Sequence, residues 1–209
     1  MGISTMDSKL TQLAAMISGW PGLVSGPADE LVADSLVLLE HLGTARHMVD
    51  VGSGGGLPGL PLKIARPDLA VTLIEADQTK AAFLVQACAA LGLPDMEVVA
   101  QRAEDVGHDP RYREAFDLAV ARALAPMPVL VELCLPLVRA GGRLLAQKTD
   151  KEDAAASERA IRLLGGSLDA VVPAPSAARR SGTIVVISKI SATPDAYPRR
   201  AGLPAKKPL

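Results

Sequence analysis

A glycine-rich turn is the part of this sequence whose residue types could most directly take part in chemistry. Residues 47–51 form a short, largely apolar run, and Gly52, Gly54 and Gly56 follow it. Glycine has no Cβ, so the backbone can adopt positive φ and approach a ligand closely. The helical pattern that follows would point its free N–H groups at the same place. The turn therefore indicates a cofactor site, although a tight strand-to-helix turn with nothing bound is the simpler alternative.

An acidic residue further along the chain favours the binding interpretation. Residues 71–75 are typical of a second buried strand, and Glu75 is its last residue. Glu75 follows Gly52 by 23 positions. In βαβ nucleotide sites a carboxylate at an offset of about 20 residues binds the ribose hydroxyls. The joint match predicts an adenosine-bearing cofactor.

Length and composition limit the classes of protein that could carry this site. The chain has 209 residues, enough for one sizeable α/β domain with small extensions. Only 2% of the residues are aromatic, which argues against an RNA-binding module that stacks bases on aromatic side chains. Cys88 and Cys134 have no metal-ligand spacing, so we expect core residues in a reducing compartment and no metal site.

No segment of the sequence has the pattern of a membrane span or a signal peptide. The longest apolar run, 127–138, contains Glu132 and two prolines and is too short to cross a bilayer. Asp7 and Lys9 interrupt the N-terminal region, which lacks a continuous apolar stretch. We therefore expect a cytoplasmic protein with no membrane partner.

The charge of the chain is unevenly distributed. The formal net charge is −1, yet residues 179–209 contain seven basic residues and only Asp195 as an acid. The basic residues are Arg179, Arg180, Lys189, Arg199, Arg200, Lys206 and Lys207. Local positive potential attracts phosphate whatever the total charge, so this end could contact an anionic macromolecule. A solvated tail without a partner is the alternative.

The hydrophobic pattern predicts the helices and strands that would position these residues. Segments typical of strands alternate with segments typical of helices, which predicts a parallel sheet with helices on both faces. The last two strands have no helix-length segment between them, so the final one should run antiparallel. Strands are expected at 47–51, 71–75, 96–100, 116–121, 143–147, 168–172 and 184–190, and helices at 9–19, 29–43, 57–66, 79–91, 129–139 and 151–164.

This arrangement resembles the Rossmann-like class I methyltransferases, which use S-adenosylmethionine. It predicts an α/β fold with a seven-stranded, mostly parallel sheet, a final antiparallel strand and a small N-terminal helical extension. The expected division is an extension at 1–45, a cofactor-binding domain at 46–190 and a basic, proline-rich tail at 191–209. Prolines in that tail argue against a helix there.

Several motifs narrow the resemblance to the RsmG (GidB) family. They are Asp50-Val-Gly-Ser-Gly-Gly-Gly-Leu-Pro-Gly-Leu-Pro61, Ala65-Arg-Pro67, Leu73-Ile-Glu-Ala76, Lys80-Ala-Ala-Phe-Leu84, Ala121-Arg-Ala123, Lys148 and the tail at 193–209 with its Tyr-Pro-Arg-Arg sequence. The resemblance covers about residues 29–209 and implies a bacterial enzyme that methylates N7 of a guanine in small-subunit (16S) ribosomal RNA. We further expect a monomer.

The resemblance also implies individual site residues. Gly52 and Leu57 match cofactor contacts in the turn, Ala103 and Glu104 match a pair at the adenine end, and Arg122 matches an arginine at the cofactor and substrate site. Two roles come from the general pattern of such folds. Asp50 would orient the methionyl amino group, and Glu75 would bind the ribose.

Guanine N7 carries a free lone pair, so the reaction needs positioning more than a general base. Arg122 is the candidate catalytic residue, because its guanidinium could bind guanine O6 or a phosphate. An ion pair with Glu104 or Asp105 is its structural alternative. Lys148, at the end of the fifth strand, could contact a phosphate or simply be an exposed strand end. The three histidines are expected to be structural or surface residues.

The N-terminal segment departs from the family pattern. Trp20 is followed by Pro-Gly-Leu-Val-Ser-Gly-Pro, and Val32-Ala33 precedes Asp34-Ser35 where the family has a basic pair. Part of the RNA-facing or cofactor-covering N-terminus is therefore missing or rebuilt. Glu30 and Asp34 lie four residues apart, and without a further ligand a solvated helix face is the expected setting.

Two other functions remain open at this point. A nicotinamide-dependent oxidoreductase would share the turn and the ribose carboxylate, although no catalytic Tyr/Lys or His pair is evident. A relative that binds the cofactor and RNA with weakened catalysis would explain the altered N-terminus. Cofactor binding and methyl transfer to ribosomal RNA distinguish the three.

Overall fold

A seven-stranded sheet forms the centre of the computed structural model, which describes residues 5–209; residues 1–4 of the expected extension lie outside it. The strand order is β3-β2-β1-β4-β5-β7-β6. The strands are β1 (His47–Val51), β2 (Ala70–Ile74), β3 (Met96–Val99), β4 (Phe116–Arg122), β5 (Val138–Thr149), β6 (Gly166–Pro173) and β7 (Gly182–Lys189). β1 to β5 are parallel, and β7 lies antiparallel between β5 and β6. The expected strand count and antiparallel final strand are confirmed.

The strand register brings the ends of the central strands together. Val51 pairs with Ile74, and Asp50 pairs with Val120. Because parallel strands end at the same edge, the residues just beyond β1, β2 and β4 lie next to one another. The glycine turn, Glu75 and the residues after Arg122 therefore share one edge of the sheet.

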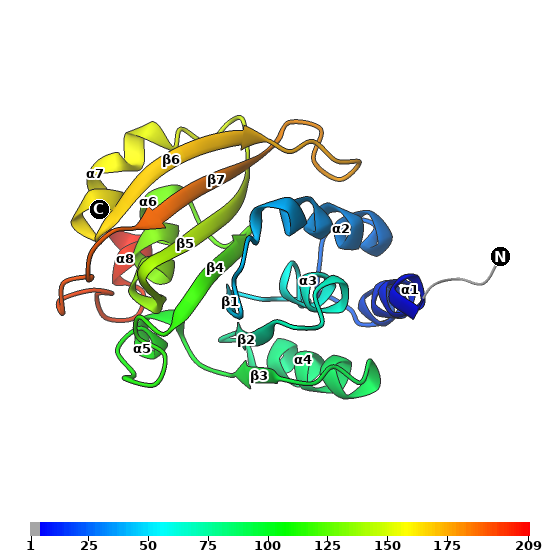
Figure 1. Ribbon diagram of the computed structural model, residues 1–209. Coiled ribbons are helices and arrows are strands. Elements are labelled where there is room, and N and C mark those ends of the chain that lie inside the picture. Colours follow the sequence, from blue (N-terminus) through cyan, green and yellow to red (C-terminus); the bar gives the residue numbers. More distant parts are fainter. Residues whose placement is uncertain (1–4) are drawn as a thin grey trace.

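Helices cover both faces of the sheet (Figure 1). α1, α2, α3 and α4 lie on one side, and α6, α7 and α8 on the other. The α-helices are α1 (Thr5–Ser18), α2 (Ala28–Ser35), α3 (Gly59–Ala65), α4 (Gln78–Ala90), α5 (Ala103–Val106), α6 (Met127–Cys134), α7 (Glu158–Leu163) and α8 (Leu203–Lys206). A side-chain cap fixes the start of α4, where the Asp77 side chain accepts hydrogen bonds from the N–H groups of Thr79 and Lys80.

Each face of the sheet has its own apolar cluster. On one face, side chains of α1, α2, α3 and α4 pack on the sheet, with Phe83 and Leu13 among the fully buried ones. On the other face, side chains of α6 and α7 pack together with the C-terminal residues Tyr197 and Leu209. The N-terminal helices and the C-terminal residues are thus parts of the two cores.

A buried lysine lies in each half of the structure. Lys63, in α3, donates to the carbonyl oxygens of Pro67 and Leu69 and is 1% exposed. Lys189, at the end of β7, donates to the carboxylate of Glu114 and to the carbonyls of Leu135 and Val138, and it is also 1% exposed. Burial lowers the pKa of both ammonium groups. These hydrogen bonds satisfy charges that would otherwise be costly to bury.

Several expected helix boundaries were wrong. The helix at 29–43 is α2 followed by a 3-10 helix at Leu36–His41. The helix at 129–139 ends at Cys134, because Pro136 lacks the N–H that an α-helix needs, and a 3-10 helix at Leu135–Leu137 leads into β5. The helix at 151–164 is confined to a 3-10 helix at Ala155–Ser157 and α7.

The tail was expected to contain no helix, and this was wrong. One turn, α8, follows Gly202, and Pro204 lies in its first turn. A proline there costs no helical hydrogen bond, because the N–H groups of the first turn have no partner within the helix. The short helix α5, after β3, was also not expected. No described helix is long and apolar enough to cross a membrane.

Candidate functional site

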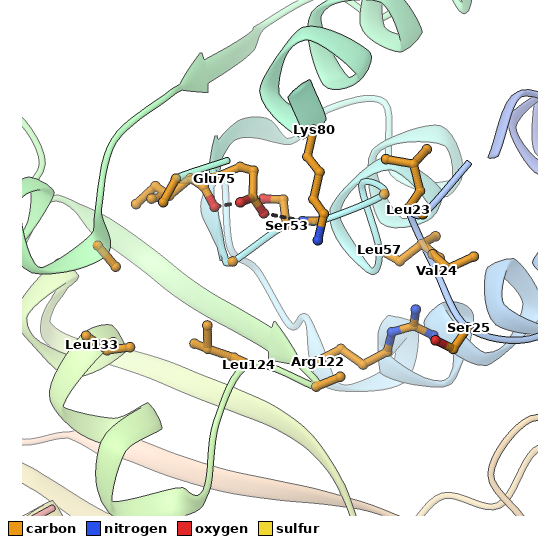
Figure 2. Close-up of a pocket in the computed structure, with 18 of the residues that line it drawn as sticks. Leu23, Val24, Ser25, Ser53, Leu57, Glu75, Lys80, Arg122, Leu124 and Leu133 are labelled. Atoms are coloured by element: carbon orange, nitrogen blue, oxygen red, sulfur yellow. Dashed lines mark hydrogen bonds between the residues drawn. The ribbon is translucent and has the colours of Figure 1, made fainter. Parts of the chain in front are cut away.

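A pocket of about 590 Å³ lies at the edge of the sheet where β1, β2 and β4 end. The glycine turn forms part of its wall, together with Glu75, residues 101–104 and residues 122–124. Residues 22–25, which link α1 to α2, close another side. Figure 2 shows Glu75 and Arg122 facing this space from different elements. The volume falls in the range usual for small-molecule sites.

The glycine turn gives the pocket a backbone wall. Gly54 has a φ of 54°, and a Cβ built on it would meet nothing closer than the Gly52 carbonyl oxygen at 3.9 Å. At Gly56, with a φ of 83°, an added Cβ would instead collide with Leu60. Gly52, Gly54 and Leu57 line the pocket, whereas Gly56 is buried behind it. Gly54 thus faces open space and Gly56 allows tight packing of α3.

Glu75 lies against this turn. Its Oε2 accepts a hydrogen bond from the Gly54 N–H at 2.8 Å, and its Oε1 accepts one from the Asp77 N–H at 2.8 Å. The carboxylate therefore joins the ends of β1 and β2, and it lines the pocket. Each carboxylate oxygen has further lone pairs that can accept hydroxyl donors.

Asp50 is buried beneath the turn. Its side chain is fully buried, and Oδ2 accepts a hydrogen bond from the Gly59 N–H at 2.9 Å. Oδ1 has no hydrogen-bond partner among the described residues. Burial raises the pKa of this carboxyl to about 7, against the lowering effects of Gly59 and Arg122. Asp50 thus lies one layer behind the pocket wall.

Arg122, from the end of β4, lines the pocket and lies near a carboxylate of the N-terminal helix. Its Nη1 lies 3.5 Å from Asp34 Oδ2 and 3.5 Å from the Leu31 carbonyl. Burial lowers the pKa of this guanidinium, and Asp34 and Asp50 oppose that shift. The expected alternative partners, Glu104 and Asp105, were wrong: the partner is Asp34, which is fully buried.

Asp34 holds a second arginine at the same place. Arg179 Nε lies 3.0 Å from Oδ1 and 2.9 Å from Oδ2, and Ser176 Oγ donates to Oδ1 at 2.5 Å. The expectation that Asp34 lies on a solvated helix face was therefore wrong. One buried carboxylate thus contacts two guanidinium groups at this side of the pocket.

Arg179 was predicted to bind RNA, and its side chain is mostly buried. It is 14% exposed and also donates to the carbonyl oxygens of Lys148 and Thr183. Its Nη2 has no hydrogen-bond partner among the described residues, and the residue lines the pocket. Arg179 can therefore reach a ligand only inside the pocket, whereas its neighbour Arg180 is exposed at the surface.

Ala103 and Glu104 line the opposite end of the pocket from the start of α5. The Glu104 side chain is 3% exposed and is held by Arg102, whose Nη2 lies 2.8 Å from Oε1. Burial would raise the pKa of Glu104, but hydrogen bonds from Arg102 and the Gly202 N–H bring it below the usual value. The Glu104 carboxylate is thus occupied by donors of the protein itself.

Lys148 is also engaged within the protein. Its side chain is 9% exposed; Nζ lies 3.3 Å from Glu152 Oε2 and donates to the Ala125 carbonyl. Of the two roles weighed for it, the exposed strand end was wrong. In this structure Lys148 fixes the segment after Arg122.

Some pocket residues were not identified from the sequence as site residues. Lys80 projects from α4 toward the centre of the pocket (Figure 2), and its ammonium makes no hydrogen bond or ion pair with any of residues 5–209. The Lys80–Leu84 motif was a signal for it. Leu23, Val24 and Ser25 come from the segment between α1 and α2, and Leu124 and Leu133 add apolar surface. The described residues include no group of three metal-ligating side chains.

The basic residues of the tail divide into two groups. Arg200, Lys206 and Lys207 are exposed. Arg199 is instead paired with the fully buried Glu132, with Nη2 to Oε2 at 2.5 Å. The prediction of an RNA-binding tail thus applies to the exposed residues, and Arg199 has a structural partner.

Comparisons with known proteins agree on a family. The family model GidB, described as rRNA small subunit methyltransferase G, matches residues 28–181. Proteins called ribosomal RNA small subunit methyltransferase G are similar: one from Roseiflexus castenholzii is 48% identical over 168 residues, covering 79% of this chain and 72% of that protein. One from Moorella thermoacetica is 46% identical over 183 residues, covering 85% and 76%.

Solved structures support the fold. The S-adenosylmethionine-dependent methyltransferase SibL matches with a TM-score of 0.63 at 16% identity, over 88% of this chain and 70% of that one. The O-methyltransferase TomG from Streptomyces achromogenes, in complex with SAM, matches with a TM-score of 0.60 at 20% identity, over 88% and 91%. The Rossmann-like methyltransferase fold expected from the sequence is confirmed.

Proposed function

This chain belongs to the rRNA small subunit methyltransferase G (GidB) family, and from that membership we propose that it methylates N7 of a guanine in bacterial small-subunit (16S) ribosomal RNA with S-adenosylmethionine. The observation that supports this most is the shared pocket of the glycine turn, Glu75 and Arg122. These residues follow β1, β2 and β4, where open α/β sheets bind their ligands.

The residues of the pocket fit S-adenosylmethionine. Glu75 would accept hydrogen bonds from the ribose hydroxyls, and the open backbone at Gly54 leaves room for the methionyl part. Ala103 and Glu104 would bind the adenine end through their backbone, and Leu133 offers it an apolar surface. The unpartnered Oδ1 of Asp50 supports its role near the amino group, behind the turn. An ammonium group nearby would favour the ionised form of this carboxyl.

When bound, S-adenosylmethionine would supply a methyl group on a sulfonium. Guanine N7 has a free lone pair and no proton to remove, so the residues of this chain would need to position the base. Arg122 would donate hydrogen bonds to guanine O6 or to a phosphate. Asp34 would hold that guanidinium in place, as it also holds the neighbouring Arg179.

Exposed basic residues would contact the RNA backbone outside the pocket. Arg180 lies in the loop after β6, and Arg200, Lys206 and Lys207 lie in the tail. Each neutralised phosphate makes binding more sensitive to salt. We place Lys148 and Arg199 among the residues that support the fold of the site. We further propose that the enzyme is cytoplasmic and monomeric. Light scattering of the pure protein would test the monomeric state.

The direct test is methyl transfer to small ribosomal subunits and to naked 16S RNA from cells that lack this gene. We expect labelled S-adenosylmethionine to yield 7-methylguanine at one position, mapped by cleavage at the modified base. Arg122→Gln should lower kcat by about 100-fold, the size of effect expected when the base is misplaced by about 1 Å. Binding of S-adenosylhomocysteine without methyl transfer would instead identify a catalytically weakened relative, and NADH oxidation would identify an oxidoreductase.

A further inference from the structure

The tail does not extend into solvent but packs beside the cofactor pocket. Residues 193–202, here called the docked tail, contact the loop after α5, the helix α6 and Glu104. Figure 1 shows this segment passing close to α5 and α6 before α8. Three independent sets of contacts hold it there.

The first set comes from the loop after α5. Arg113 donates to the carbonyl oxygens of Tyr197 at 2.8 Å, Thr193 at 2.8 Å and Pro194 at 3.3 Å. The same guanidinium donates to the Gly107 carbonyl at 2.9 Å. Arg113 therefore joins the docked tail to the end of α5 through one side chain.

A close approach at Gly107 belongs to the same set. A Cβ on Gly107 would lie 2.7 Å from Pro198 Cγ. Gly107 has a φ of −65°, which any residue can adopt. The shortest contacts of an added Cβ are thus with Pro198 of the docked tail, and the Ala103 carbonyl oxygen lies further away, at 3.3 Å.

The second set is a buried ion pair with α6. Glu132 accepts hydrogen bonds from the Arg199 N–H and Nε at 2.8 Å each, in addition to the contact with Nη2. Charge-assisted, bidentate pairs of this kind fix geometry as well as adding energy. The pair sets the position of the chain three residues before Gly202.

The third contact reaches the pocket wall. The Gly202 N–H donates to Glu104 Oε1 at 2.9 Å, and the same oxygen accepts from Arg102. Glu104 lines the pocket and begins its α5 turn together with Ala103. The docked tail thus supplies one of the donors that orient this carboxylate.

From these contacts we propose that the docked tail is a positioning element of the cofactor site. It holds Glu104, and with it the backbone of residues 103–104, in the orientation that binds the adenine end of S-adenosylmethionine. Arg199, Arg113 and Gly202 are positioning residues, since none of them lines the pocket. This inference rests on the proposed function for the identity of the cofactor.

Two full-length variants test the proposal. Arg199→Gln removes the pair with Glu132, and Gly107→Ala pushes Pro198 away without changing any charge. We expect both to bind S-adenosylhomocysteine about tenfold more weakly in calorimetry and to raise the KM for S-adenosylmethionine. The kcat at saturating cofactor and the KM for RNA should stay within about twofold. Arg199→Lys should recover part of the affinity.

The matched control is Arg200→Gln, one residue further along the chain, whose side chain is exposed. Its affinity for S-adenosylhomocysteine should equal that of the wild type. Far-UV circular dichroism shows whether each variant folds; if Arg199→Gln leaves Glu132 unpaired and does not fold, Gly107→Ala decides.

Folded variants with wild-type cofactor affinity would overturn the proposal, as would a loss confined to RNA affinity. A wild-type protein that binds no S-adenosylhomocysteine would instead refute the proposed function. Wild-type cofactor binding without methyl transfer would refute only the reaction, and the affinity comparison would still decide the role of the docked tail.

Discussion

At the scale of single residues, Glu75 connects the backbone of the turn to a predicted ligand hydroxyl. Glu75→Gln keeps the size of the side chain but loses the charge and one acceptor oxygen, so either the Gly54 or the Asp77 contact is lost. We expect affinity for S-adenosylhomocysteine to fall about 10- to 100-fold, corresponding to about 1.5–3 kcal/mol for hydrogen bonds to a charged group. Calorimetry measures this loss.

The exposed Glu40 provides the control for that experiment. Glu40→Gln should bind the ligand as the wild type does. An unchanged affinity in Glu75→Gln would show that this carboxylate only closes the turn.

Asp50 gives a prediction about pH. Its pKa is raised to about 7 in the folded protein, so the native state binds the proton more tightly than the unfolded chain, whose value is about 3.8. The contribution of Asp50 to the free energy of unfolding should therefore fall as pH rises from about 4 to about 7 and stay level above that. Asp50→Asn carries no charge and should be more stable than the wild type at pH 7.5, by up to about 4 kcal/mol.

Urea unfolding of both proteins at pH 4.5 and pH 7.5 measures this difference. The free energy of unfolding of Asp50→Asn, relative to that of the wild type, should be higher at pH 7.5 than at pH 4.5. Asp29→Asn, at an exposed position, should keep the wild-type pH dependence. An equal difference between Asp50→Asn and the wild type at both values would contradict the raised pKa.

At the scale of elements, the buried Asp34 joins α2 to the end of β4 and to the loop between β6 and β7. Asp34→Asn removes the charge that balances Arg122 and Arg179. Breaking one side of a buried ion pair typically costs about 3–5 kcal/mol, and we expect a loss of that size in the free energy of unfolding. Urea titration checks it.

The exposed pair of Glu158 and Arg162 gives a matched comparison. Glu158→Gln should change the free energy of unfolding by less than about 1 kcal/mol, because water screens that pair. If Asp34→Asn were equally mild, the buried cluster would not hold the N-terminal helices in place.

The sequence was informative wherever the signal is local. The glycine turn, its two flanking strands and the offset to Glu75 lie within one βαβ unit, and the strands formed close to their expected bounds except β5, which begins at Val138 instead of residue 143. The setting of Asp34 could not be predicted, because its partner Arg179 is 145 residues away. Gly141-Gly142 suggested the end of a helix, yet both glycines lie inside β5, which pairs with β4. Contacts between residues far apart in the sequence determined both the environment of Asp34 and the conformation of Gly141-Gly142.

At the scale of the whole molecule, the basic residues fall into two groups. Some are buried and form ion pairs within the protein, and others are exposed to solvent. Arg200, Lys206 and Lys207 are exposed, so replacing all three with Gln should weaken RNA binding without lowering the melting temperature. If each contacts one phosphate, the slope of log affinity against log salt should become shallower by about 2–3. Filter binding at several salt concentrations measures the slope.

The exposed Arg111, paired with Asp109, offers the control. Arg111→Gln should leave the slope within about half a unit of the wild type. A triple variant with the wild-type slope would show that Arg200, Lys206 and Lys207 do not contact the RNA.

The two buried lysines allow each half of this protein to be followed separately by chemical labelling. An amine-reactive ester modifies only ammonium groups that reach solvent and lose a proton, so Lys63 and Lys189 should stay unlabelled while the fold is intact. Mass spectrometry of peptides containing them would then time the opening of the α3 side and of the β7 side independently. A ligand that tightens only one half would slow the labelling of only one lysine.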